Sequence, residues 1–280
     1  MKGLQWLPIL KFSTFFVFFG RAWQHLFWDA PYRSLLWDES LLKPVVEGLF
    51  GGSWTTYVTA TSTDVFIQNS IFYTGVLYLM AAIAVLFYEK YRNKLLYYII
   101  IFGGANLIFL SFLLMKEKFY HFAQFFEHAI QFSLPFVFVK TVREEWTLRR
   151  LEIVLKLLVA IVFVSHGLYA IGYYPVPGNF VDMVLGILPM SESQAKILLS
   201  VAGFMDFLVA FYIFVPRVKV FALWYAVVWG LLTAFARIVS GFHIDFALQS
   251  IHQELYGTLY RLGHGLVPLV LLLIHREQKA

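Results

Sequence analysis

Long apolar runs, separated by short clusters of charged residues, dominate the chain. Residues 71–88 (IFYTGVLYLMAAIAVLFY) and 95–115 (LLYYIIIFGGANLIFLSFLLM) contain no charged side chain. Each run has about the 20 residues that a helix needs to cross a bilayer. The pattern therefore predicts an all-α fold, a polytopic bundle of membrane helices.

Charge clusters divide the chain into eight such runs, and each run predicts one helix. The predicted spans are residues 8–28, 70–88, 95–115, 119–139, 151–173, 195–215, 219–239 and 256–275. The connection 29–69 is longer than a simple turn requires. It contains SLLWDESLLKPVVEGLF, an amphipathic segment that we expect to lie along the membrane surface. Segments 174–193 and 240–255 are expected to be shorter coverings of the same kind.

Composition favours a membrane protein over a soluble one. Charged residues make up 14% of the chain and hydrophobic residues 60%, whereas soluble domains contain about 25% charged residues. The net charge of +5 comes from small clusters between apolar runs. Such clusters set membrane topology and form no continuous basic face, so nucleic acid is not an expected partner. The absence of cysteine excludes disulfides, thiol redox chemistry, iron–sulfur clusters and covalent c-type haem.

Positive residues gather in alternate connections, which predicts an orientation. The richer set comprises Lys90, Arg92 and Lys94; Lys140, Arg143, Arg149 and Arg150; Arg217 and Lys219; and Arg276 and Lys279. The positive-inside rule places these connections and both termini in the cytoplasm. Lys116 and Lys118 fall on the opposite side and dissent from the rule. The first apolar run precedes no small-x-small cleavage site, so we expect it to be retained as a helix.

The fourth and eighth predicted spans share one spacing of polar residues. The fourth contains His121, Gln124, His128, Gln131 and Pro135, and the eighth contains Glu254, Gly257, Arg261, His264 and Pro268. The common +3, +4, +3, +4 spacing puts each set on one helix face. Gly20 and Gly167 match in the first and fifth spans, as do Tyr78 and Asp206 in the second and sixth. We therefore predict two four-helix units, residues 1–145 with the long outer loop 29–69, and residues 146–280.

The second half resembles a known family. SHGLYAIG at 165–172 and GFMDFLVAFYIF at 203–214 resemble the DoxX/DoxD-like four-helix membrane proteins. Members typically have a His-Gly pair near the end of the first helix and an acid within the second. The first half matches less well, since Phe19 and Tyr78 replace these residues. It resembles the HTTM relatives of vitamin K-dependent carboxylases slightly more. The resemblance implies a bacterial cytoplasmic (inner) membrane and allows quinone-linked redox subunits among other roles.

Ionisable residues within the predicted spans lie mostly in the outer half of the membrane. Nine of them are the candidate ligand-binding residues: Arg21, His25, Glu127, His128, His166, Asp206, Arg237, Arg261 and His264. A charge at the bilayer centre costs roughly 2.5–3.5 kcal/mol, so nine facing lipid would cost on the order of 20 kcal/mol. That exceeds the stability of about 5–15 kcal/mol typical of a folded protein. We therefore expect these side chains to face inward.

Two ion pairings follow from this expectation, Arg21 with Glu127 and Asp206 with Arg261 or Arg237. The hypothesis is a polar cavity that opens to the outer side and is closed at the cytoplasmic side. Its expected aromatic walls are Trp23, Tyr169, Tyr173 and Tyr260. Ion pairs that only fix helix positions are the competing interpretation. His25 can also snorkel to the headgroups.

Three functional classes stay open at the level of the sequence. The chain can be a binding or redox-accessory protein whose cavity takes a quinone, a lipid or another amphiphile. It can be a small-molecule transporter, or a structural partner of another membrane protein without a ligand. Bis-histidine haem lacks its spacing, a retinal lysine is missing from the last span, and no HExxH or nucleotide-binding loop occurs. A metal site across helices from His128, His166, His264 and Glu127 is not indicated by any local motif, and no cofactor is named by the residues.

Overall fold

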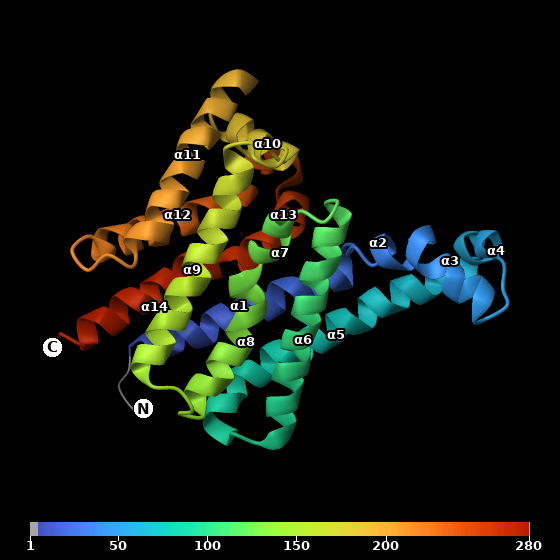
Figure 1. The fold of residues 1–280 in the computed structure, drawn as a ribbon, viewed down its shortest axis with the longest axis horizontal. Coiled ribbons are helices and arrows are strands. Elements are labelled where there is room, and N and C mark those ends of the chain that lie inside the picture. Colours follow the sequence, from blue (N-terminus) through green and yellow to red (C-terminus); the bar gives the residue numbers. More distant parts are fainter. Residues whose placement is uncertain (1–4, 280) are drawn as a thin grey trace.

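The computed structural model describes residues 5–279, and within that range every regular element is a helix. Six helical stretches are long and apolar enough to cross a membrane, which identifies a multi-pass membrane protein. They are α5 (Thr61–Tyr91), α6 (Lys94–Glu117), α9 (Leu148–Ala170), α11 (Glu192–Tyr212), α12 (Lys219–Ser240) and the stretch Ile244–Glu277. The predicted all-α membrane fold is thus confirmed (Figure 1).

The last apolar stretch consists of three helices in succession. They are the 3₁₀ turn η1 (Ile244–Phe246), α13 (Ala247–Arg261) and α14 (Gly263–Glu277). A single residue, Leu262, separates α13 from α14.

Two of the eight predicted spans correspond to helices that are less regular or less apolar. The first is α1 (Trp6–Phe27), which contains Lys11 and Arg21. The other is the fourth predicted span, which is split into α7 (Phe122–Phe126) and α8 (Ala129–Val142) by a turn at Glu127 and His128. α1 has 22 residues, as many as α12, but is not apolar enough to count with the six stretches, whereas α7 and α8, with 5 and 14 residues, are each too short.

The long connection after α1 folds into short helices that project from the bundle. They are α2 (Arg33–Leu36), α3 (Glu39–Gly48) and α4 (Trp54–Thr59). The helix α3 begins at an aspartate cap, because the side chain of Asp38 accepts a hydrogen bond from the backbone of Leu41 at 3.0 Å. In Figure 1 these helices form an arm at the far end of α5. A further short helix, α10 (Gly178–Ile187), covers the end of the bundle near α11 and α12.

Polar contacts gather several helix ends at one end of the bundle. Glu277 accepts a hydrogen bond from the indole of Trp6 at 2.9 Å, so the start of α1 lies beside the end of α14. Arg92 pairs with Glu144 at 3.6 Å and joins the connection α5–α6 to the connection α8–α9. Lys219, at the start of α12, lies 3.8 Å from Glu152 at the start of α9. The connections that the charge pattern assigns to one side are therefore at one end of the molecule.

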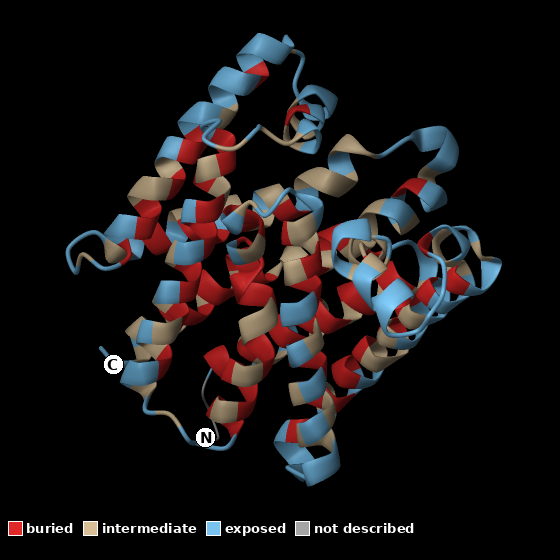
Figure 2. Ribbon diagram, turned by 45° about the vertical axis from the view of Figure 1, so that its right-hand side comes forward, coloured by how far each residue is buried: buried red, intermediate tan, exposed pale blue. Residues whose placement is uncertain are grey.

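The interior forms where the helices cross near their middles (Figure 2). Small residues allow these crossings. A Cβ on Gly20 of α1 would lie 2.8 Å from the backbone nitrogen of Tyr260, and one on Gly230 of α12 only 2.6 Å from the carbonyl carbon of His264. Large apolar side chains on the outer helix faces are exposed, as expected of surfaces that face lipid; Phe102 and Phe221 are examples.

Candidate functional site

Arg21 lies in the interior of the bundle and holds three helices together. Its guanidinium donates hydrogen bonds to Gln24 and to Gln131 of α8, each at 2.7 Å. The same group stacks over the ring of Tyr260 from α13, with its central carbon 3.8 Å from the ring centroid. Only 2% of Arg21 is exposed. These contacts replace the water that the charge would lose on burial.

His25 follows Arg21 by one helical turn and is also buried. Its Nδ1 lies 2.8 Å from the carbonyl oxygen of Arg21, and its ring packs edge-on against Tyr78, with centroids 5.1 Å apart. The interpretation that His25 snorkels to the headgroups is wrong, since 3% of the residue is exposed.

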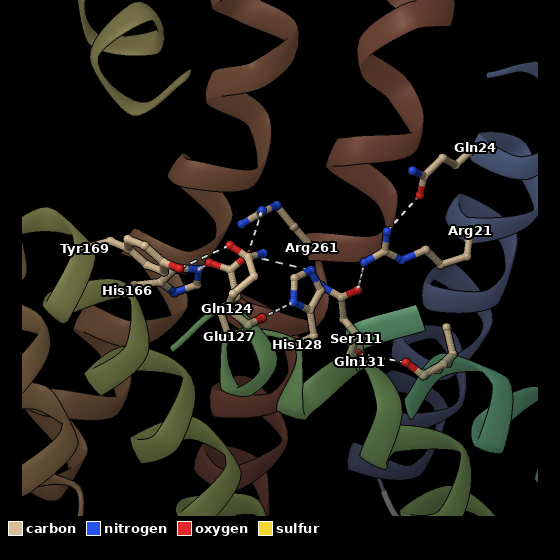
Figure 3. A network of polar contacts seen from close by, with 11 residues as sticks. Arg21, Gln24, Ser111, Gln124, Glu127, His128, Gln131, His166, Tyr169 and Arg261 are labelled. Carbon is tan, nitrogen blue, oxygen red and sulfur yellow. Dashed lines mark hydrogen bonds and ion pairs between the residues drawn. The ribbon is translucent and has the colours of Figure 1, made fainter. Parts of the chain in front are cut away.

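A second group of polar residues surrounds Glu127 at the turn between α7 and α8 (Figure 3). Gln124 donates a hydrogen bond to its carboxylate at 2.9 Å. Two histidine nitrogens lie slightly farther away, Nε2 of His128 at 3.6 Å and Nε2 of His166 at 3.7 Å. Arg261 completes the group at 3.7 Å. The carboxylate of Glu127 is thus the centre toward which α7, α9, α13 and the turn before α8 direct their polar side chains.

The predicted pairings differ from the observed ones. The hydrogen bonds of Arg21 go to glutamines, and the arginine that pairs with Glu127 is Arg261. Asp206 makes no ion pair within 4.0 Å among the described residues, so its predicted pairing with Arg237 or Arg261 is wrong. The spacing of residues along each helix indicated its buried face. It carried no information on how neighbouring helices are rotated about their axes relative to one another.

A cavity of about 460 Å³ lies between α9, α10, α11 and α12. Its walls are mostly apolar, from Phe163, Phe180, Met183, Trp229 and other residues of these helices. Ionisable residues from α9, α11, α12, α13 and α14 reach the same space: His166, Asp206, Arg237, Arg261 and His264. The volume falls within the range of about 300–1,000 Å³ usual for small-molecule sites.

Each of these five ionisable residues has a buried atom without a hydrogen-bond partner. The atoms are Nε2 of His166 and His264, Oδ1 of Asp206, and Nε of Arg237 and Arg261. Buried polar atoms are nearly always paired, and an unpaired one costs about 1–3 kcal/mol. The described residues contain ten such atoms, and five of the ten belong to residues that line this cavity.

The nine candidate residues are therefore divided between two places. Five line the cavity, whereas Arg21, His25, Glu127 and His128 lie in the adjoining core. Glu127 and Arg261 connect the two, because Arg261 contacts Glu127 and also lines the cavity.

The aromatic walls differ from the predicted ones. Trp23 donates a hydrogen bond to the carbonyl of His252, Tyr260 lies beneath Arg21, and Tyr173 is 71% exposed. Tyr169 is buried beside Gln124 and is not among the residues that line the cavity. The cavity is instead walled by Phe180 and Trp229, which sequence reasoning did not select. Gln124 and Gln131 were noted only for their spacing, although both are direct partners of the buried charges.

No group of three or more histidine or acidic side chains within residues 5–279 is arranged to hold a metal ion. Comparisons with known proteins add no assignment: no protein-family model, no curated protein and no solved structure matches the chain.

Proposed function

We propose that this protein binds an amphiphilic small molecule, such as a quinone or a lipid, in the cavity between α9, α10, α11 and α12. The single observation that carries the proposal is the set of five unpartnered polar atoms around an otherwise apolar space of about 460 Å³. An apolar ligand body would pack against the walls, and its polar end would pair with the ionisable side chains that line the space. A redox-accessory role is one use of such a site.

The proposed topology is eight crossings with both termini in the cytoplasm. Two contacts support it: Trp6–Glu277 places the start of α1 beside the end of α14, and Arg92–Glu144 places the connection α5–α6 beside the connection α8–α9. Under this topology the cavity lies toward the outer side. A bacterial inner membrane and a DoxX-like origin of the second half belong to the same proposal, on the strength of the motifs around His166 and Asp206.

The packing of the helices supports the proposed internal repeat. α1 packs against α5 as α9 packs against α11, and α6 packs against α8 as α12 packs against α14. Gly75 precedes Tyr78 by three residues, as Gly203 precedes Asp206. A Cβ on Gly75 would lie 3.0 Å from His25, and one on Gly203 would lie 2.8 Å from Ala170. The last span of each four-helix unit also packs against the first helix of the other unit: α13 contacts α1, and α7 contacts α9.

One observation favours a transporter as the second candidate. The fourth and eighth predicted spans are both interrupted where their ionisable residues lie, at Glu127–His128 and at Leu262. Discontinuous helices at matching positions of two repeats are typical of transporter binding sites. Flux into proteoliposomes that Arg21→Ala abolishes would favour this candidate. A purely structural role would instead leave the cavity without a ligand.

The test is the amount of amphiphile that copurifies with the protein, measured by mass spectrometry of an organic extract. Ala236→Phe fills the cavity from α12, and Ala105→Phe adds the same side chain to an exposed position of α6. We expect about one bound amphiphile per chain in the wild type and in Ala105→Phe, and at least a tenfold loss in Ala236→Phe. Equal amounts in all three proteins would mean that the cavity is not the binding site.

A further inference from the structure

Arg237 forms no ion pair within 4.0 Å among the described residues, although Glu127 and Glu254 lie near enough to attract its charge. It lies in the last turn of α12, lines the cavity, and is partly buried. Among the described residues its side chain has no carboxylate within 4.0 Å and no hydrogen bond, and its Nε is fully enclosed. Gly257 of α13 makes room for it, since a Cβ there would come within 3.2 Å of the Arg237 side chain. An unpaired charge beside an apolar cavity is costly unless something else neutralises it.

Arg261 faces the same cavity and is only partly neutralised. Its nearest acid, Glu127, is 3.7 Å away, which is beyond a hydrogen bond, and Glu127 also lies near two histidines. The Nε of Arg261 remains free. Both guanidinium groups thus line one space, and a guanidinium prefers carboxylate or phosphate because it can donate two parallel hydrogen bonds.

The acid in the cavity lies away from Arg237. Asp206 projects from α11 beside Trp229, and Trp229 precedes Arg237 by eight residues of α12. At 1.5 Å per residue this is about 12 Å along the helix axis. Asp206 therefore does not serve as the counter-ion, and it leaves the Arg237 end of the cavity available to an anion.

We propose that the ligand is an anionic amphiphile, an apolar chain that ends in a carboxylate or phosphate group bound by Arg237 and Arg261. This inference rests on the proposed function and specifies the chemical class of its ligand. The chain lies against α10 and α11, whose Phe180, Met183 and Leu198 are among the apolar residues of the wall. A neutral quinone leaves the charge of Arg237 without a partner and is the weaker ligand.

The experiment compares single-chain ligands that differ only at the polar end. Hexadecanoic acid, hexadecyl phosphate and hexadecanoic acid methyl ester are titrated into the purified full-length protein in mild detergent at pH 8, together with decyl-ubiquinone. Binding is followed by calorimetry. We expect the two anions to bind at least tenfold more tightly than the ester and the quinone, because a hydrogen bond to a charged group is worth about 1.5–3 kcal/mol, or roughly 10–100-fold. The stronger of the two anions identifies carboxylate or phosphate as the natural end group.

Variants then assign the effect to Arg237. Arg237→Gln should lower the affinity for the anions at least tenfold and leave the affinity for the ester unchanged. The control is Arg217→Gln, in the connection between α11 and α12 and outside the cavity, which should change neither affinity. Arg237→Lys should retain part of the preference. The acid–ester comparison needs only the wild type, so the test stands even where a variant does not fold.

The outcomes separate the two proposals. Equal binding of acid, ester and quinone in the wild type would overturn the anionic ligand and leave the amphiphile site in place. Preference for the acid that survives in Arg237→Gln would also overturn the assignment to Arg237. Absence of binding by all four compounds, together with no copurified amphiphile, would overturn the proposed function itself.

Discussion

Lys116 is one of the two lysines that depart from the predicted orientation, and it has a specific partner. Its ammonium pairs with the carboxylate of Asp38, at the cap of α3. The partner neutralises the charge locally, so Lys116 adds little to the positive charge of that side of the membrane. The pair also ties the projecting arm to the end of α6.

Substitution of Asp38 separates the two roles of its side chain. Asp38→Asn keeps the cap on Leu41, because asparagine caps as well as aspartate, but removes the ion pair. Asp38→Ala removes both. We expect hydrogen exchange in residues 41–48 to be fastest in Asp38→Ala, intermediate in Asp38→Asn and slowest in the wild type. Identical exchange in the two variants would assign the whole effect to the ion pair, which both variants lose.

The pH dependence of this pair has a definite sign. The hydrogen bond from Lys116, assisted by the hydroxyl of Ser40, holds the pKa of the Asp38 carboxyl below its usual range. The stabilisation is therefore complete above the unfolded pKa of about 3.9 and is lost as the pH falls through the lower pKa of the folded state. The difference in Tm between wild type and Asp38→Asn should be constant from pH 8 to 5 and shrink below about pH 4.

At the scale of the helices, close crossings depend on glycines that admit no side chain. Gly20→Ala and Gly230→Ala each place a methyl group against the backbone of the last helices, α13 and α14. Backbone cannot rotate away as a side chain can, so we expect a loss of about 1–3 kcal/mol in unfolding free energy for each. Gly48→Ala in α3, where nothing lies within 4 Å, is the matched control and should be neutral or slightly stabilising. Thermal unfolding in detergent measures all three.

Hydropathy predicted where the helices lie but not where they break. Every predicted span coincides with a helix or a pair of helices, because a run of apolar residues has no stable alternative in a membrane. The turn at Glu127 and His128 contains no glycine or proline that would predict it, since Pro135 lies about two helical turns farther on. The cavity was hidden for a related reason: it is enclosed by α10, a helix that the sequence presented only as a short covering segment.

At the scale of the whole molecule, the sequence located the charged interior but not its partners. The nine ionisable residues were expected to avoid lipid because all of them lie within predicted membrane spans. Seven of the nine have 13% exposure or less. Which arginine meets Glu127 depends on how α13 packs against the turn between α7 and α8, a contact between Arg261 and a residue 134 positions earlier in the chain. No local pattern in the chain encodes that contact.

The eight-crossing topology can be tested directly because the chain contains no cysteine. Single cysteines at Lys90, Lys118 and Arg149 occupy exposed positions in successive connections. If α7 and α8 together cross the membrane, Lys118→Cys must react with a membrane-impermeant maleimide from the side opposite to Arg149→Cys, and Lys90→Cys must react from the same side as Arg149→Cys. The ion pair of Arg92 with Glu144 requires this result, since it holds the connections around Lys90 and Arg149 together. Phe50→Cys, in the arm after α1, should label with Lys118→Cys, and labelling of all four after permeabilisation is the control. Labelling of Lys118→Cys and Arg149→Cys from one side would instead mean that the broken helix turns back within the membrane, and the cavity would then need a different route to the exterior.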